Sequence, residues 1–403
     1  MRLLARAIAL LIFCSALQAC VSVPQRNPVP EALVDQAEVV NTAGVRFWAD
    51  AVPEDIEERV LRLRRQFAGS GIVQPGEELN LLSISGGGAN GAFGAGLLKG
   101  WTESGTRPDF MIVTGISTGA LIAPFAFLGS DYDDDLEALY TGIKTSDLMK
   151  RRRLIAGLMS DAIADTQPLR ELLIEHVDTE MIDAIAAEHL KGRRLLIGTT
   201  NIDAKRGVIW DVSYIATKGT PESRQLIRDV MLASASIPGV FPPVRIQVEA
   251  DGEEYDEMHV DGGVSRQVFL HAVPVNVQQS AWDMGLDNPR NLYVIRNAML
   301  TPRWSAVKPK LLPVLGASIS TLIRTQGMGD LYRLYLGTLR DGTVFRLASV
   351  PPDFDIEATE DFDPEYMKAL FATAYELSRN GYDWKTAPPG IELSVDLPQE
   401  PSN

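Results

Sequence analysis

The chain has 403 residues, 45% of them apolar, 23% charged and 7% aromatic, a composition that supports a folded core and excludes disorder for most of its length. Its 53 acidic residues outnumber its 38 basic ones and give a net charge of −15; because such a chain repels a phosphate backbone, we expect no nucleic-acid partner. Both cysteines, Cys14 and Cys20, fall in the first twenty residues, so the rest of the chain has no thiol for a disulfide, a thiolate metal site or a cysteine nucleophile.

Residues 1–19 have the features of a bacterial signal peptide. A basic start precedes an apolar stretch, Ala7 to Leu17, that is too short to span a bilayer. Leu17-Gln18-Ala19-Cys20 resembles the bacterial lipobox, which implies cleavage before Cys20 and lipidation of its thiol. Ser22 favours the outer membrane, so we expect a protein of the bacterial cell envelope anchored by acyl chains. An ordinary secreted protein is the alternative.

Composition and periodicity divide the remaining chain into segments. We predict a tether at residues 20–30, an N-terminal extension at 31–75 and a main domain at 76–300. A helical part packed on that domain follows at 301–388, and a loose tail at 389–403. The extension is polar, and its clearest helical pattern runs from Asp55 to Arg65. We find no internal repeat.

Short apolar runs alternate with helical patterns in the main domain. Strands are predicted at Leu79–Ser85, Asp109–Thr114, Leu195–Thr200, Gly207–Val212 and Asn291–Ile295, and a hairpin at Val244–His259. Helices are predicted at Ala92–Trp101, Ala120–Leu128 and Gln225–Ser234. This alternation predicts an α/β three-layer sandwich, with a mainly parallel central sheet and helices on both faces. From Leu311 onward the pattern is helical, so we expect a helical C-terminal segment after the sandwich.

The first glycine-rich turn has two interpretations. Gly86-Gly87-Gly88-Ala89-Asn90-Gly91 satisfies the G-x-G-x-x-G pattern of a dinucleotide site between a strand and a helix. A nucleotide site also needs an acidic residue at the end of the second strand, but Asp109 stands at its beginning. The alternative is an oxyanion hole, in which backbone N–H groups point at a developing negative charge. A turn needed only for packing is the third possibility.

The second glycine-rich turn offers a nucleophile. Gly115-Ile116-Ser117-Thr118-Gly119 is a G-x-S-x-G sequence directly between a strand and a helix, the context of a nucleophile elbow. The flanking glycines, Gly115 and Gly119, allow the sharp turn that exposes Ser117 at the start of a helix. Both turns follow the carboxyl ends of strands, where open α/β sheets place their sites.

A serine nucleophile needs a base, and the histidines are poorly placed for that role. Only His271 fits the Ser-Asp-His order of the α/β-hydrolases, and its apolar surroundings favour a packing role; the others are His176, His189 and His259. Asp261-Gly262-Gly263 is the better candidate, because such a turn brings a carboxylate close to another backbone segment. An ordinary surface turn is the alternative.

Taken together, these turns resemble the sequence blocks of the patatin-like phospholipases. The blocks are Gly86–Gly91, Gly115–Ala120, Ala233–Pro238 with Phe241–Pro243, and Asp261–Gly263, all in the right order. The resemblance covers about Leu79 to Asn297 and identifies residues 76–300 as a patatin-like catalytic domain. It implies a Ser-Asp dyad without a catalytic histidine, with Ser117 as nucleophile, Asp261 as base and the oxyanion hole at Gly86, Gly87 and Gly88.

The resemblance implies a serine acyl hydrolase that cleaves fatty-acyl esters of phospholipids or lysophospholipids through an acyl-enzyme. One alternative is an acyltransferase with the same site. The other is a catalytically silent lipoprotein that binds lipid or a partner. The family commonly carries Arg or Lys where this chain has Asn90, so a cation has to come from Lys99 or elsewhere, or is absent. Aspartate is a weak base at neutral pH, so Asp261 needs a raised pKa or a very short contact with Ser117.

Four further stretches have open roles. Lys150 to Arg153 is basic and either contacts anionic head groups or is a solvated surface. Leu311 to Ile323 is apolar; we expect core packing there, with a lid or a lipid-facing element as the alternative. The acidic stretches Asp131–Asp135 and Asp353–Asp363 lack the spacing of a calcium loop, so we predict no metal and no cofactor.

Overall fold

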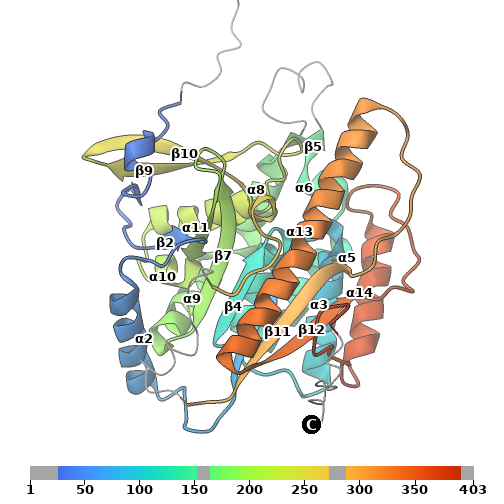
Figure 1. The fold of residues 1–403 in the computed structure, drawn as a ribbon, viewed down its shortest axis with the longest axis horizontal. Helices are drawn as coiled ribbons and strands as arrows, with labels where there is room; N and C mark the ends of the chain where they lie inside the picture. The colour runs from blue at the N-terminus through green and yellow to red at the C-terminus, as the bar shows by residue number, and fades with distance from the viewer. Residues whose placement is uncertain (1–25, 152–163, 272–286, 392–403) are drawn as a thin grey trace, which may run out of the picture.

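The computed structural model describes residues 26–151, 164–271 and 287–391 (Figure 1). The predicted signal peptide, Cys20, Arg152, Arg153 and most of the predicted tail therefore lie outside the described residues.

Strands and helices alternate along most of the chain. The strands are β1 (Glu38–Val39), β2 (Arg46–Trp48), β3 (Leu79–Ile84), β4 (Ile112–Ile116), β5 (Lys150–Arg151), β6 (Ala164–Asp165), β7 (Arg194–Asn201), β8 (Arg206–Asp211), β9 (Val244–Ala250), β10 (Glu253–Asp261), β11 (Arg290–Met299) and β12 (Thr343–Val350). The α-helices are α2 (Ile56–Ser70), α3 (Gly91–Glu103), α4 (Thr118–Leu128), α5 (Asp133–Gly142), α6 (Thr145–Leu148), α8 (Gln167–His176), α9 (Thr179–Lys191), α10 (Val212–Ala216), α11 (Pro221–Ser234), α13 (Leu311–Asp341) and α14 (Pro364–Ser378). Short 3₁₀ turns lie at Glu31–Leu33, Gly88–Asn90, Ser130–Tyr132 and Gly262–Val264.

One ten-stranded sheet runs through the molecule, and its centre is parallel. Strands β7, β4, β3, β11 and β12 are neighbours in that order and all run the same way. On the far side of β7 the sheet continues in antiparallel fashion through β10 and β9 to β1, while β8 and β2 branch from β7. Because the central strands are parallel, their carboxyl ends and the turns that follow them meet at one edge of the sheet.

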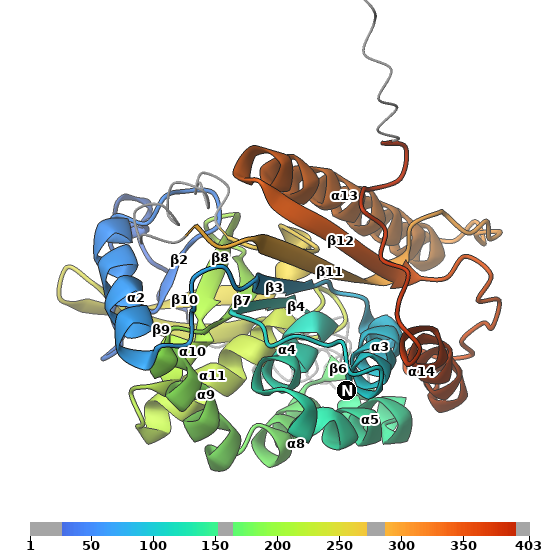
Figure 2. The same ribbon diagram turned by 90° about the horizontal axis from the view of Figure 1, so that it is seen from below.

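The sheet is the middle of three layers. Figure 2 shows α13 on one face, over β11 and β12, and α3, α4, α9 and α11 on the other. The expected α/β sandwich with a mainly parallel central sheet is confirmed.

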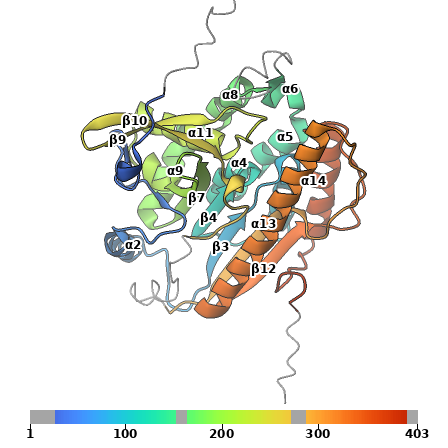
Figure 3. The same ribbon diagram turned by 45° about the horizontal axis from the view of Figure 1, so that its top comes forward.

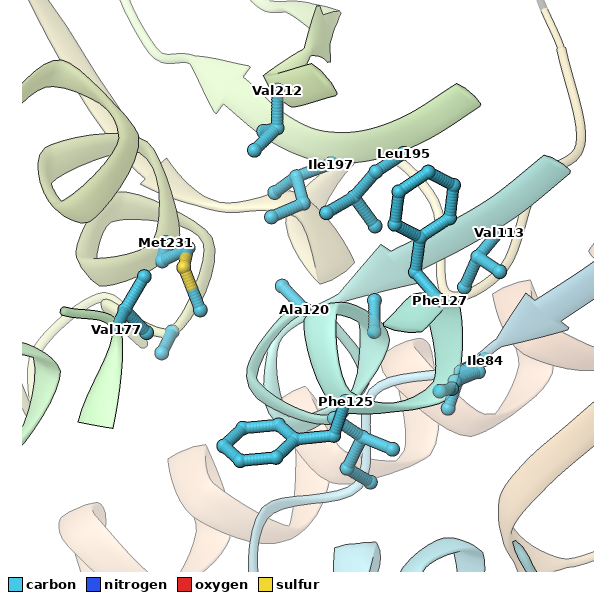
Figure 4. Close-up of a cluster of buried hydrophobic side chains, with 14 of the residues drawn as sticks. Ile84, Val113, Ala120, Phe125, Phe127, Val177, Leu195, Ile197, Val212 and Met231 are labelled. Carbon is cyan, nitrogen blue, oxygen red and sulfur yellow. The ribbon is translucent and has the colours of Figure 1, made fainter. Parts of the chain in front are cut away.

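Helix α4 is the buried centre of the second layer. It is apolar on all sides, which is typical of a helix surrounded by other elements, and nine of its eleven residues are buried. Figure 4 shows Ala120 and Phe127 of α4 among Val113 of β4 and Leu195 and Ile197 of β7. This packing holds the first turn of α4, and with it the residue that precedes the helix, at the edge of the sheet.

The predicted elements of the main domain are all present, with ends that differ by a few residues. The structure adds strands that the sequence pattern did not indicate: β1 and β2, from the predicted N-terminal extension, the two-residue strands β5 and β6, and β12, from the predicted helical part. Strand β12 pairs with β11 over its whole length, so residues 343–350 belong to the same sheet as the main domain. No helix in the described part of the chain is long and apolar enough to cross a membrane.

The C-terminal helix α14 packs on α3 where α3 carries glycines. A Cβ atom on Gly96 would lie 2.2 Å from the carbonyl oxygen of Phe371, so the two helix backbones are in direct contact there. We predict that Gly96→Ala lowers the free energy of unfolding by about 1–3 kcal/mol, since the added methyl group separates the helices.

The matched control is Gly142→Ala at the end of α5, where nothing lies within 4 Å of the added Cβ. Urea denaturation of the two variants checks the prediction. A Gly96→Ala protein as stable as the Gly142→Ala protein would contradict close packing of α14 on α3.

Candidate active site

Ser117 occupies a strained turn between β4 and α4. Its φ of 55° and ψ of −126° lie where residues other than glycine are rarely found. The neighbouring glycines make the turn possible, because a Cβ atom on Gly115 would lie 2.3 Å from the Gly119 carbonyl oxygen, and one on Gly119 would lie 2.3 Å from that of Ile84. The turn has the geometry of a nucleophile elbow and carries the Ser117 side chain into a cleft.

Asp261 ends β10 and faces the Ser117 hydroxyl. The Ser117 hydroxyl is near enough to the carboxylate to lower its pKa, and the Asp261 Oδ1 accepts a hydrogen bond of 2.7 Å from the N–H of Gly263. Both side chains are nearly inaccessible, with Ser117 7% and Asp261 5% exposed. The structure therefore joins two residues that the sequence analysis selected from separate turns.

Burial changes the acidity of Asp261. Removal from water raises its pKa from 3.8 to about 6, although the hydrogen bonds from Ser117 and Gly263 act in the opposite direction. No charged side chain contributes to this shift. The carboxylate is thus a stronger base than an exposed aspartate and is still largely ionised at neutral pH.

Strand β7 lies between the strands that carry the two residues, and small groups on it bring them close. Asp261 is opposite Thr199 in the β10–β7 ladder, and Ile116 is opposite Gly198 in the β4–β7 ladder. A Cβ atom on Gly262 would lie 2.4 Å from the Gly198 carbonyl oxygen, so the turn after Asp261 lies directly on β7.

The segment after α11 holds both turns. Ser234 Oγ accepts a 2.9 Å hydrogen bond from the N–H of Ser117 and donates one of 2.7 Å to the Gly198 carbonyl. Two residues later, the Ser236 carbonyl accepts a 2.9 Å hydrogen bond from the N–H of Asp261. The sequence analysis singled out this block but gave it no role; its role in the structure is to position the serine and the aspartate together.

The glycine turn after β3 lies against Ser117, but its three N–H groups are not equivalent. A Cβ atom on Gly86 would lie 3.1 Å from the Ser117 Cβ. The N–H of Gly86 donates to the Gln267 carbonyl at 3.2 Å, whereas those of Gly87 and Gly88 donate to no group in the described part of the chain. Two free N–H groups therefore remain beside the serine, and Gly86 provides the close approach.

The residues considered as alternatives lie outside this cleft. His259 is bonded to Thr199 and Glu257, and His189 to Ser213, while no histidine is among the described residues that line the cleft. Lys99 is ion-paired with Asp134 and Glu137 of α5 and does not reach the cleft, so it is not the cation that compensates for Asn90.

The cleft has a volume of about 660 Å³ and is lined by both glycine turns, by the end of β11 and by α13. Asn90 lies at its edge, where its side-chain oxygen accepts a 2.6 Å hydrogen bond from the Tyr366 hydroxyl. Among the lining residues that the sequence analysis missed, Arg296, Arg303 and Arg324 are charged. The only sequence signal for Arg296 is its position directly after the last predicted core strand, and the only one for Arg324 is its position directly after the apolar stretch Leu311 to Ile323.

The apolar stretch at the start of α13 is exposed, so the expectation of core packing there is wrong. Leu311 is 74% and Leu322 69% exposed, and Leu315 and Ile319 are about half exposed. These four residues follow one another at spacings of four, four and three, which places them on one face of the helix. We call this face the α13 apolar face.

Comparison with known proteins agrees with this geometry. Residues 82–274 match the family model of the patatin-like phospholipases. The matched region, which is just under half of the chain, begins within β3, extends past Asp261 and contains both glycine turns. In the part of the chain that the structure describes, no group of three or more His, Cys, Asp or Glu side chains is arranged to hold a metal.

Two solved structures are similar to about three quarters of the chain. VipD from Legionella pneumophila is 15% identical, with 76% of this chain and 66% of that chain covered at a TM-score of 0.36. The structure of full-length SpcU in complex with full-length ExoU from Pseudomonas aeruginosa gives 15% identity, 76% and 52% coverage and a TM-score of 0.33. The chain thus spans about two thirds and about half of these two chains. No curated protein matches it.

The raised pKa of Asp261 predicts a stability change with pH. At pH 8 the folded protein has to bury an ionised carboxylate, so Asp261→Asn should raise the free energy of unfolding by up to about 3 kcal/mol. As pH falls through the folded-state pKa of about 6, the folded wild-type protein takes up a proton before the unfolded chain does. The advantage of the variant should therefore be smaller by roughly 2 kcal/mol at pH 4.5.

Asp256→Asn is a control of opposite sign. Burial acts to raise the pKa of Asp256, but the N–H of Asn27 and the guanidinium of Arg26 outweigh it and lower this pKa. The variant should therefore lose stability at pH 8 relative to the wild-type protein. Urea denaturation from pH 4.5 to 8 measures both variants, and an Asp261→Asn effect that is constant across this range would contradict the raised pKa.

Proposed function

We propose that this chain is a serine acyl hydrolase that cleaves fatty-acyl esters of phospholipids or lysophospholipids. The observation that carries the proposal is the close approach of the Ser117 hydroxyl to the buried Asp261 carboxylate, beside the N–H groups of Gly87 and Gly88, which have no acceptor among the described residues. The patatin-like phospholipase domain over the same residues supports this reaction type.

In the proposed mechanism, Asp261 accepts the Ser117 proton as the serine oxygen attacks the ester carbonyl. The N–H groups of Gly87 and Gly88 stabilise the tetrahedral oxyanion, for which one donor is typically worth about 2.7–4 kcal/mol. Asp261 then returns the proton to the leaving alcohol, and the acyl-enzyme forms on Ser117. Water, deprotonated by Asp261, hydrolyses this ester and restores the serine. A base with a pKa near 6 is well matched to both proton transfers.

A lipid substrate is supported by the surroundings of the cleft. Helix α13 turns one side to the cleft, through Ser320, Ile323 and Arg324, and exposes its apolar face on another. An exposed apolar helix face next to a reaction cleft suits an enzyme that works at a lipid surface. We propose that this face inserts among the lipids when the substrate enters.

The proposed location is the bacterial cell envelope, at the outer membrane by our sequence criterion of Ser22, with Cys20 as the lipid anchor. Figures 1 and 3 show the first described residues and the first turns of α13 on the same side of the molecule. An anchor that precedes these residues and the α13 apolar face are therefore able to contact one membrane together.

Substitution of the dyad tests the reaction. Ser117→Ala and Asp261→Asn should each abolish ester hydrolysis while the protein stays folded, and an active-site fluorophosphonate should label the wild-type protein at Ser117 but not the Ser117→Ala variant. His271→Gln should keep nearly full activity, because His271 lies outside the cleft. Full activity of either dyad variant, or loss with His271→Gln, would refute the proposed chemistry.

Charged substitutions test whether the α13 apolar face contacts lipid. Leu315→Asp combined with Leu322→Asp should slow phospholipid hydrolysis in vesicles by roughly 10- to 100-fold, because two leucines no longer enter the lipid. Hydrolysis of a water-soluble short-chain ester should not change, since neither side chain lines the cleft. Leu339→Asp, exposed at the other end of the same helix, is the matched control. Equal rates for all three proteins on vesicles would rule out a lipid contact here.

A further inference from the structure

Arg296 is a buried cation in the wall of the cleft, and the structure leaves it without a hydrogen-bond partner. Its side chain extends from β11 and is 2% exposed. Its Nε and Nη1 atoms are both buried, and neither donates a hydrogen bond to any group in the described ranges. Unsatisfied buried guanidinium atoms are costly, so a group that is kept in this state and faces a cleft indicates a ligand.

The acid that acts on Arg296 is already engaged. Asp330 of α13 accepts a 2.7 Å hydrogen bond from the N–H of Gln267 and one of 2.6 Å from Arg333. Burial lowers the pKa of Arg296 to about 10, with a smaller contribution from the positive charge of Arg324 on the same helix, and the two outweigh the opposite effect of Asp330. Arg296 is thus still protonated at neutral pH, and this part of the cleft has an excess of positive charge.

The helix above Arg296 has a space shaped for its guanidinium group. A Cβ atom on Gly327 would lie 2.4 Å from both Nη1 and Nη2 of Arg296. Gly327 is on the side of α13 that also carries Ser320, Ile323 and Arg324, which line the cleft. Only a residue without a side chain allows the guanidinium to lie at this place, so Gly327 positions Arg296.

We propose that Arg296, assisted by Arg324, binds the phosphodiester of a glycerophospholipid in the Ser117 cleft and so selects phospholipid over neutral acyl esters. A planar guanidinium with free N–H groups is suited to phosphate oxygens. In this proposal the phosphate-binding cation comes from β11, not from the glycine turn, where Asn90 stands, or from Lys99. This assignment rests on the proposed function, since it names the substrate group held at the same site.

Selectivity between two esters is the first test. The full-length wild-type and Arg296→Gln proteins are compared on lysophosphatidylcholine and on a monoacylglycerol of the same acyl chain. We expect kcat/KM for the lysophospholipid to fall about 30-fold or more in the variant, and kcat/KM for the neutral ester to change by less than about threefold. Equal losses on both esters, or no loss on either, would overturn phosphate recognition.

Substitution of Gly327 provides a second, independent variant. Gly327→Ala should reproduce the selective loss, because the new methyl group displaces the guanidinium while alanine favours the helix. The control is Gly329→Ala in the same helix, where nothing lies within 4 Å of the added Cβ and selectivity should be unchanged. Wild-type selectivity in the Gly327→Ala protein would show that the observed position of Arg296 is not required.

A binding experiment separates this inference from the proposed reaction. Calorimetric titration of the Ser117→Ala protein with glycerophosphocholine should show binding that is lost when Arg296→Gln is added, whether or not the wild-type protein hydrolyses esters. Inorganic phosphate is the second probe. Binding of inorganic phosphate without binding of glycerophosphocholine would assign the site to free phosphate and overturn a lipid head group, and failure of both to bind would overturn an anion site. By contrast, a wild-type protein that is neither labelled by a fluorophosphonate nor active on either ester would refute the proposed function alone.

Discussion

The backbone conformation of Ser117 is the constraint on which the site depends. A residue with a side chain occupies the left-handed region only when its surroundings hold it there, and here the surroundings are backbone groups in direct contact. Gly115 and Gly119 touch one another and the end of β3, and Ser234 binds the N–H of Ser117 itself. The burial of α4 then keeps the whole turn in place. Because the helix is apolar on all sides and surrounded by other elements, no face of it can turn towards the solvent without exposing apolar side chains.

The same close packing makes Asp261 a stronger base than an exposed aspartate. The turn after β10 contacts β7 so closely that the carboxylate is removed from water, and its pKa rises to about 6 without help from a neighbouring charge. Burial of this carboxylate costs folding free energy at neutral pH, which the hydrogen bonds from Ser117 and Gly263 offset in part. The site thus combines a strained serine with an aspartate that is destabilising when ionised, as is common where a structure serves chemistry.

Helix α13 lines the cleft with one side and faces the solvent with another. One side packs on the sheet and the cleft and provides the space for Arg296, while the α13 apolar face is open to solvent. The spacing of its apolar residues satisfies either a core helix or a surface helix, since the same periodicity serves both. What decides between them is whether another element covers the face, and such a contact is not encoded in the helix itself.

A feature of this protein was predictable from the sequence when the residues that determine it lie close together in the chain. The strands of the main domain, the two glycine turns and the choice of Ser117 follow from local pattern, because strand periodicity and turn chemistry involve residues close together in the chain. The choice of Asp261 as base also needed the resemblance to the patatin-like phospholipases, since an Asp-Gly-Gly turn by itself is an ordinary surface turn as well. Strand β12 was missed because its place is set by pairing with β11, about fifty residues earlier. The approach of Ser117 to Asp261, the raised pKa of Asp261, the engaged N–H of Gly86 and the two Arg296 nitrogens without a partner among the described residues were decided only by the tertiary structure, since each arises where segments far apart in sequence exclude water together.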